Sequence, residues 1–434
     1  MKGFVNAVGT LLLIVTPSAA AAQGEARPIP LDEAVRLAQR NAPATVQARN
    51  ALSTNAATVR QRYAAYVPTL SFGSNVSRQV GTRFVADLNE FRPNPQPWRG
   101  GHSFNSSIDL FNGRRLFDLQ SARSNLDAAE ATEVTQTFTV ALQVKQQYYG
   151  VLAAREQRAA ADKQLEQAEQ QLRASTARVA AGAATRSDSL RSSIQVGNAR
   201  LAILTADNAI ATANAALSRL VGTESIVTAV ANDTSDTGEI ALSDADLLAL
   251  AERGPAVRQA RAQHAAALQS SRSSKTLYLP RVSASVGWAY SAADTGIQFL
   301  GDKELRNTTT RLTVNFPLLD GLSRETQVAT ASANADNARV QLRDAELNAR
   351  QQMIQQLGAY RTAQARVEIQ LETVAAGEED LRVQQERYNL GASTLLDLLS
   401  SQTTLDQARR DLIQARLDAR TAKAQIETLI GRDL

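Results

Sequence analysis

The 434-residue chain carries one run of features twice, and this internal repeat limits what it can fold into. Pro43 and Pro255 close two matching segments and lie 212 positions apart. Tyr66-Val-Pro68 matches Tyr278-Leu-Pro280 at the same offset. Further along, the offset becomes 209 for four pairs: Ala122 and Ala331, Asn125 and Asn334, Asp127 and Asp336, and Ala129 and Ala338. We therefore expect a fold made of two equivalent halves.

The repeat divides the chain into a leader, two halves and a linker. We predict a signal peptide over residues 1–22, because Lys2 precedes a short apolar run and small residues surround Ala22. The first structural repeat is predicted at 23–221 and the second at 243–434, with a Thr-, Asp-, Ser- and Gly-rich linker at 222–242. Within the repeats, strands are expected at about 69–112 and 281–318, and helical hairpins at about 115–221 and 324–431.

Each half contains a helical stretch of unusual length. No proline interrupts the chain from about Arg115 to Ala181, or from about Arg324 to Leu390. At ~1.5 Å per residue, such a helix reaches on the order of 100 Å. A heptad stripe in the second half has its counterpart 209 positions earlier: Tyr360, Val367, Val374, Leu381 and Tyr388 match Val151, Arg158, Leu165, Leu172 and Val179. The two halves thus share one coiled-coil register.

Strands are predicted where apolar and polar residues alternate. In the first half, Phe104, Ile108 and Leu110, with Ser106 between them, alternate with polar residues, and in the second half Val282, Ala284, Val286, Trp288 and Tyr290 alternate with small or polar ones. Two structures suit such strands, a sandwich with one wet face or a membrane barrel with lipid outside and water inside. Four strands per chain cannot close a barrel alone, so the barrel requires an oligomer.

The composition excludes several classes of function. The 47 basic and 43 acidic residues are interspersed, so there is no basic stripe for nucleic acid. The chain has no cysteine, and its two histidines, His102 and His264, stand in unrelated contexts. No apolar stretch beyond the leader approaches the length of a transmembrane helix. We therefore predict no catalytic residue, no metal site and no cofactor, and the chain is not expected to be an enzyme.

The two long helices end at similar sequences, which predict tight helical turns. Four residue types recur at equivalent positions: Arg178 and Arg387, Gly182 and Gly391, Thr185 and Thr394, and Asp188 and Asp397. Glycine suits the left-handed residue that closes a helix, while threonine and aspartate suit the start of the helix that returns. Turn chemistry alone can explain these residues. A paired turn at the far end of a long hairpin is also a natural docking surface, so both interpretations stay open.

Over essentially the whole mature chain, the sequence resembles the TolC-like outer-membrane factor family. The resemblance rests on the duplicated Tyr-x-Pro, on the strand ends Leu110-Phe-Asn-Gly113 and Leu318-Leu-Asp-Gly321, and on the two Arg-x-x-x-Gly-x-x-Thr-x-x-Asp tips. It implies a mainly α fold with a small β part. Four membrane strands per chain would close a twelve-stranded β-barrel in a homotrimer, joined to a periplasmic α-helical tunnel.

The resemblance also implies a function in efflux or type I secretion. The channel would be a passive duct from an inner-membrane pump of RND, ABC or MFS type and a periplasmic adaptor (membrane fusion) protein to the outside. Its barrel would contact outer-membrane lipid, and nucleic acid is not an expected partner. The alternative is a periplasmic coiled-coil adaptor or scaffold, which would share the signal peptide, the long hairpins and the heptads.

Site residues carried over from the family lie at the tips. The adaptor would dock in two grooves, one at Arg178, Gly182, Thr185 and Asp188, the other at Arg387, Gly391, Thr394 and Asp397. A periplasmic gate would pair Tyr388 with Asp188, while Asp397 would face the pore. Some relatives carry an arginine and an aspartate where this chain has Ser393 and Ser400. Weaker closure, or closure by apolar residues such as Leu396 and Leu399, is therefore expected.

Overall fold

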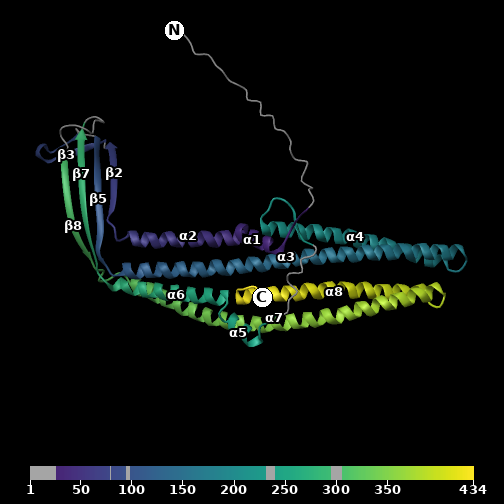
Figure 1. Cartoon of the computed structure of the whole chain (residues 1–434). Coiled ribbons are helices and arrows are strands. Elements are labelled where there is room, and N and C mark those ends of the chain that lie inside the picture. Colours follow the sequence, from purple (N-terminus) through teal and green to yellow (C-terminus); the bar gives the residue numbers. More distant parts are fainter. Residues whose placement is uncertain (1–25, 79, 94–97, 231–239, 295–304) are drawn as a thin grey trace, which may run out of the picture.

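The computed structural model describes residues 26–434 except 79, 94–97, 231–239 and 295–304. The predicted signal peptide, residues 1–22, lies outside the described residues. The helices form a long rod, and a sheet stands across one end of it (Figure 1). Within the described part of the chain, no helix has both the length and the apolar character needed to cross a membrane.

Two helices of 67 residues each, α3 (Arg114–Ala180) and α7 (Ser323–Asn389), run the length of the rod (Figure 1). Each is followed by a helix of 36 residues that folds back on it, α4 (Arg186–Val221) and α8 (Leu395–Ile430) respectively. All four helices begin and end at positions related by the sequence offset of 209. The two hairpins are therefore equal in length and equivalent in position.

Shorter helices complete the rod on the side of the sheet. Helix α2 (Pro43–Ala64) packs on α3, and α6 (Pro255–Lys275) packs between α3 and α7. The end of α4 meets the end of α1 (Leu31–Asn41), where Asn41 Nδ2 donates to the carbonyl of Val221 at 3.3 Å. Likewise, the start of α6 meets the end of α8. Each long helix is thus flanked by two helices placed end to end.

Two apolar cores lie midway along the rod. The first surrounds Tyr148 of α3, and the second surrounds Met353 of α7 together with α5 (Asp244–Ala251). The Tyr148 hydroxyl donates to the carbonyl of Ile29 and accepts from the N–H of Val230, each at 3.1 Å. These contacts hold a small parallel sheet of β1 (Arg27–Ile29) and β6 (Val227–Ala229) against α3. The segment 222–242, predicted only as a linker, therefore contains a buried strand.

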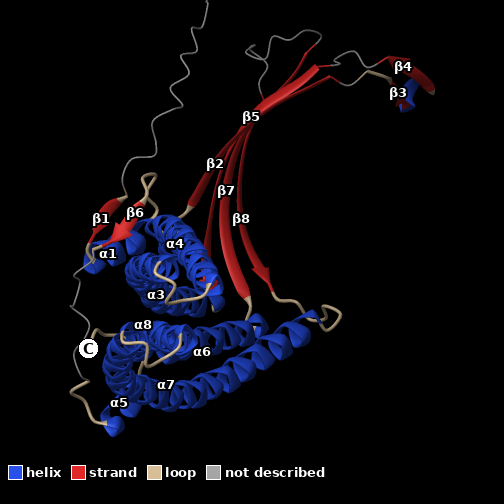
Figure 2. Cartoon of the chain, turned by 90° about the vertical axis from the view of Figure 1, so that its right-hand side faces the viewer, coloured by secondary structure: helices blue, strands red, loops and turns tan. Residues whose placement is uncertain are grey.

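Four antiparallel strands form the large sheet, in the order β2 (Thr69–Arg78), β5 (Trp98–Asn112), β7 (Arg281–Asp294) and β8 (Leu305–Asn315). The central pair joins the two halves of the chain, and β2 and β8 are the edges. We call the end farthest from the helices the outer end. Beyond it lies a hairpin of β3 (Thr82–Val85) and β4 (Glu90–Pro93), joined through the short 3-10 helix η1 (Ala86–Leu88) (Figure 2).

The large sheet has one apolar and one polar face, as the alternation predicts. Phe72, Phe104 and Trp288 lie side by side on the apolar face, and the first two rings are 4.8 Å apart between centroids. The opposite face carries mainly Ser, Thr, Asn and Gly. One detail differs from the prediction. Leu110 is the unpaired residue where the register shifts, so that Phe111, and not Leu110, lies opposite Val282.

Candidate functional site: the hairpin tips

Both hairpins turn through the same backbone motif. At the first tip, Gly182 has φ +74°, and the N–H of Ala183 donates to the carbonyl of Arg178 at 2.8 Å. At the second tip, Gly391 has φ +77°, and the N–H of Ala392 bonds to the carbonyl of Arg387 at the same distance. A side chain at either glycine would meet no atom within 4 Å. Backbone conformation, and not lack of space, therefore requires glycine at both positions.

The returning helices begin with matching capping boxes. The N–H of Thr185 donates to Asp188 Oδ2 at 3.0 Å, and the N–H of Asp188 donates to Thr185 Oγ1 at 3.3 Å. Thr394 and Asp397 repeat this pair at 3.0 and 3.2 Å. Hydrogen bonds from the Thr394 side chain, and then from its backbone N–H, hold the pKa of Asp397 below its usual value, with a smaller contribution from Arg387. The predicted helix-capping roles of these four residues are therefore confirmed.

The two tip arginines make different contacts. Arg178 reaches across to the second hairpin, where its guanidinium lies 4.5 Å from the centroid of the Tyr388 ring and donates to the Tyr388 carbonyl. Arg387 stays within its own turn and donates to the carbonyl of Ala392 at 3.4 Å. Arg178 therefore links the two tips to each other. The sequence pattern did not predict this link, although the change from Val179 to Tyr388 at one register position was its only visible sign.

The second tip has an apolar core of its own. Tyr388, Leu395 and Leu398 are buried together, with Leu381 and Leu399 half-buried around them. Leu396 is not part of this core and is 64% exposed. Of the two apolar gate candidates, Leu396 is thus available to an exterior surface, and Leu399 is partly used in packing.

The hydrogen bond expected between Tyr388 and Asp188 is not formed in this chain. The Tyr388 hydroxyl is buried and has no hydrogen-bond partner among the described residues. The Asp188 carboxylate instead accepts from Thr185, through both its backbone N–H and its hydroxyl, the latter at 2.8 Å. The Asp188 carboxylate is thus engaged in the capping box of its own helix. Arg178 provides the contact with Tyr388 instead.

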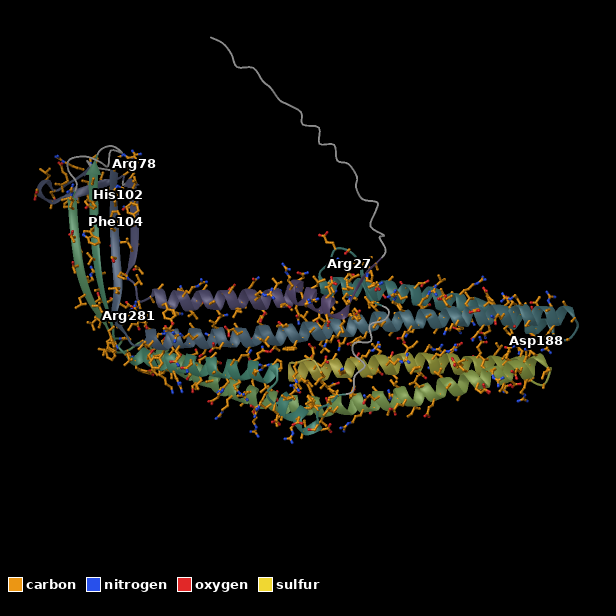
Figure 3. The ribbon with its side chains drawn as sticks, in the orientation of Figure 1. Arg27, Arg78, His102, Phe104, Asp188 and Arg281 are labelled. Carbon is orange, nitrogen blue, oxygen red and sulfur yellow. The ribbon has the colours of Figure 1, made fainter. Side chains whose placement is uncertain are left out.

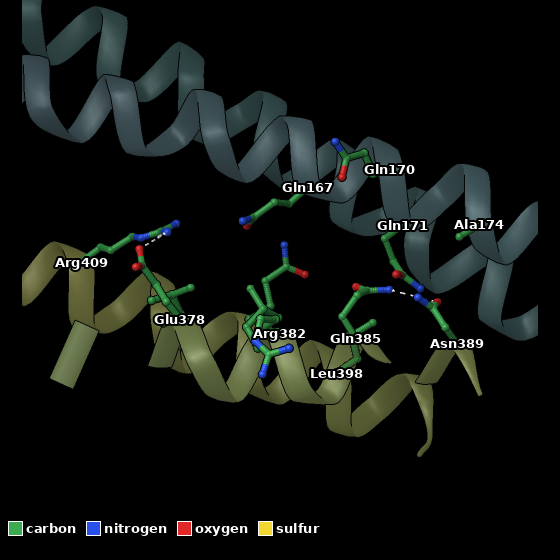
Figure 4. A pocket seen from close by; sticks show the side chains of 13 residues that line it. Gln167, Gln170, Gln171, Ala174, Glu378, Arg382, Gln385, Asn389, Leu398 and Arg409 are labelled. Atoms are coloured by element: carbon green, nitrogen blue, oxygen red, sulfur yellow. Dashed lines mark hydrogen bonds and ion pairs between the residues drawn. The ribbon is translucent and has the colours of Figure 1, made fainter. Parts of the chain in front are cut away.

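A polar cavity of about 530 Å³ lies between the hairpins behind the tips (Figure 4). Glutamines of α3 line one side, and residues of α7 and α8 line the other. Gln171 is only 6% exposed, yet neither its Oε1 nor its Nε2 has a partner among the described residues. On the far side, Arg409 and Glu378 form an ion pair at 2.8 Å (Figure 4). Because buried amides need hydrogen bonds, this cavity is suited to water.

Nothing at the tips resembles a metal or catalytic site. In the described ranges of the chain, no three His, Cys, Asp or Glu side chains are grouped so that they could hold a metal ion. The tips consist of helix caps, a cation–π contact between Arg178 and Tyr388, and a polar cavity behind them. Such groups can hold two hairpins together or release them, and they offer polar surface to a partner.

Comparison with known proteins gives a consistent answer. The family model for outer membrane efflux protein matches residues 34–223 and 248–432. Protein CyaE of Bordetella pertussis is 26% identical over 395 residues, which cover 87% of this chain and 79% of CyaE. The pyoverdine export outer membrane protein OpmQ of Pseudomonas aeruginosa is 26% identical over 337 residues, covering 76% of this chain and 69% of OpmQ.

The fold is also that of a solved outer membrane protein. The structure of VceC from Vibrio cholerae matches with a TM-score of 0.72 at 19% identity, over 93% of this chain and 96% of VceC. The two segments matched by the family model fall on the two halves that contain the equivalent hairpins. The chain therefore belongs to the outer membrane efflux protein family, and it is an outer-membrane duct for export and not an enzyme.

Proposed function

We propose that three copies of this chain form one channel, which receives substrate from an inner-membrane pump through a periplasmic adaptor. The large sheet is the observation that carries the proposal. Its strands of 10, 15, 14 and 11 residues are long enough to cross an outer membrane. Its apolar face suits lipid and its polar face suits water.

The number of copies follows from the edges of the sheet. Among the described residues, strands β2 and β8 each have one unpaired edge, and pairing β8 of one copy with β2 of the next would remove both edges. Two copies would give a barrel of eight strands, whose interior side chains fill. Three copies would give twelve strands and leave a lumen, which an export duct needs.

The helical rod supports the same assembly. The helices pack in the order α4, α3, α8 and α7, so α4 and α7 form its flanks near the tips (Figure 2). Both helices carry apolar side chains that are 57–64% exposed. Those of α4, Leu190, Ile194, Leu201 and Leu204, lie near the tip, whereas those of α7, Val340, Leu347 and Ile354, lie in the half of the rod toward the sheet. Exposed stripes at heptad-like spacing are typical of helices that pack against another helix. In the proposed trimer, neighbouring copies cover them.

The tips are the proposed site of adaptor docking and of gating. Docking would use the exposed turns around Gly182 and Gly391 together with their capping residues. The gate would use the second tip, where Arg178 contacts the ring and the carbonyl of Tyr388 and where Leu396 is exposed. Asp188 and Asp397 would act through the helix starts that they cap, and Leu399 through the small core beneath. Opening would then require the Arg178–Tyr388 contact to separate beside the polar cavity.

Fractionation and conductance together test the proposal. The protein should be recovered in the outer membrane, run as a trimer on an unheated gel and as a monomer after boiling, and conduct ions in planar bilayers. A soluble periplasmic monomer without conductance would instead support the adaptor or scaffold alternative.

A further inference from the structure

The apolar face of the large sheet changes character at its outer end. There it carries two arginines, each lying against an aromatic ring. The guanidinium carbon of Arg78 is 5.4 Å from the centroid of the Trp98 ring, and that of Arg306 is 5.7 Å from the Tyr290 ring. Figure 3 shows Arg78 nearest the outer end, with His102 and Phe104 following toward the helices. Two positive charges thus lie at the outer end of a mainly apolar face.

Strand register places both arginine–aromatic pairs on the apolar face. Arg78 lies opposite Trp98, six residues along β2 from Phe72, so the two-residue period puts it on the same side as Phe72. Tyr290 lies opposite both His102 and Arg306. The His102 ring in turn stacks on that of Phe72, with 6.0 Å between centroids.

A shallow hollow separates the two pairs. Gly100 contributes no side chain there, and its neighbours across the strands are the small or short residues Val76 and Ala292. The hollow has a volume of about 30 Å³ and is bordered by His102 and Tyr290. The face is therefore slightly indented between the two arginines.

Both arginines are available to bind an anion. Neither Arg78 nor Arg306 forms an ion pair with another residue in the described part of the chain. An arginine that lies over an aromatic ring keeps its N–H groups free, and these can bind two phosphate oxygens at once. By strand spacing, the two Cα atoms are on the order of 20 Å apart. They can therefore engage two separate phosphates.

We propose that Arg78, Trp98, His102, Tyr290 and Arg306, here called the outer arginine cluster, bind the phosphorylated headgroup of an outer-leaflet glycolipid. The inference rests on the proposed function, because it takes the apolar face as the lipid-facing one. Trp and Tyr are typical of the headgroup level of a membrane. The acyl chains would extend from this level along Phe72, Phe104 and Trp288, which continue the same face toward the helices.

Binding measurements on the detergent-purified, delipidated oligomer test this site. The probes are lipopolysaccharide, the same lipid after enzymatic dephosphorylation, and inorganic phosphate. The variant is Arg78→Gln with Arg306→Gln. The matched control is Arg311→Gln, since Arg311 lies on the polar face of β8, opposite Ser285. We expect the control to bind lipopolysaccharide like the unmodified protein, and the double variant to bind about 30-fold more weakly.

Each other outcome overturns the inference. Equal binding by the double variant would show that the arginines do not hold the lipid. Equal binding of dephosphorylated lipid would exclude phosphate recognition, and competition by inorganic phosphate at the same concentration would indicate a site for the free ion. Gel mobility and conductance of the same samples separate the two proposals. If the unmodified protein inserts as a trimer but the double variant binds lipopolysaccharide with unchanged affinity, only the proposed lipid site is wrong.

Discussion

The two hairpin tips share one backbone turn but differ in how they are packed. In both, the first helix ends at a glycine with left-handed backbone conformation, and the returning helix begins with a Thr–Asp capping box. Only the second has a buried core at the turn itself, around Tyr388. At the first tip, the nearest apolar cluster, around Ala168 and Val196, lies farther back along the hairpin. The first tip instead contributes Arg178, which holds the second.

This difference shows how two copies of one unit can take different roles in a contact between them. The turn is a local structure, set by a few neighbouring residues, and both halves form it. The contact between the tips depends on one position, Val179 in the first half and Tyr388 in the second. Because of this one difference, the second tip presents an aromatic ring that Arg178 of the first tip contacts.

The largest expected effect comes from removing the Tyr388 ring from the small apolar core at the second tip. Tyr388→Ala should lower the free energy of local opening at the second tip by about 3 kcal/mol, because a buried ring is lost. Val179→Ala should cost about 1 kcal/mol or less at the first tip, because Val179 is only half-buried. Hydrogen exchange of each turn measures both values.

Tyr388→Phe is the control for this substitution. It keeps the ring and removes only a hydroxyl without a partner among the described residues, so its cost should be below ~0.5 kcal/mol. A large loss in this variant would mean that the hydroxyl has a partner in the assembled channel, and the proposed importance of the ring alone would be wrong.

The next effect concerns the link between the tips. Arg178→Ala removes a cation–π contact and a charged hydrogen bond, together about 2 kcal/mol, and should shift the gate toward its open form by about 30-fold. Arg387→Ala should leave gating unchanged, because Arg387 bonds only within its own turn. Open probability in planar bilayers distinguishes the two variants. Equal effects would contradict the asymmetry of the arginines.

The turns themselves should behave alike. Gly182→Ala and Gly391→Ala each force a side chain into the left-handed region, at a cost of about 1 kcal/mol. Neither new methyl group meets another atom, so backbone strain is the only difference. Hydrogen exchange at the two turns should therefore change to the same extent, and a clear inequality would show that the turns are less equivalent than their backbones.

The smallest effect is a dependence on pH at the second capping box. Hydrogen bonds from Thr394 hold the pKa of Asp397 below its ordinary value of 3.8. The box therefore contributes its full stability above that value and loses it as the pH falls through the lowered pKa. Protection of the first turn of α8, corrected for intrinsic exchange, should fall in this range. Asp397→Asn should abolish the dependence, and a persistent dependence would assign it to another group.

The features that could be predicted from sequence are the local or periodic ones. A proline-free stretch predicted α3 and α7 to within a residue at each start, and the capping residues predicted both turns. The buried strand Val227–Ala229 was missed, because three residues are too few to show a period. The register shift at Leu110 was missed because the alternation of apolar and polar residues continues in the sequence through Leu110. The bulge at this residue is a backbone feature that the residue pattern does not show.

The tip contacts were harder to predict, for a physical reason. Arg178 and Tyr388 are 210 positions apart, and their meeting depends on how two hairpins lean on each other. The same is true of the polar cavity, whose lining comes from three helices. Several glutamines close together in α3 could have suggested a polar interface, but a solvated helix face shows the same composition.

Because α3 and α7 are equal in length, as are α4 and α8, the two halves of the chain each set the same length for the helical rod. Each 67-residue helix sets a distance of about 100 Å between the sheet and a tip. Removing one heptad from a single hairpin would leave its tip about 10 Å short of the other. A ring of tips at two heights could neither close nor present a level rim. Such a protein can therefore change its reach only when both halves of the chain gain or lose whole heptads together.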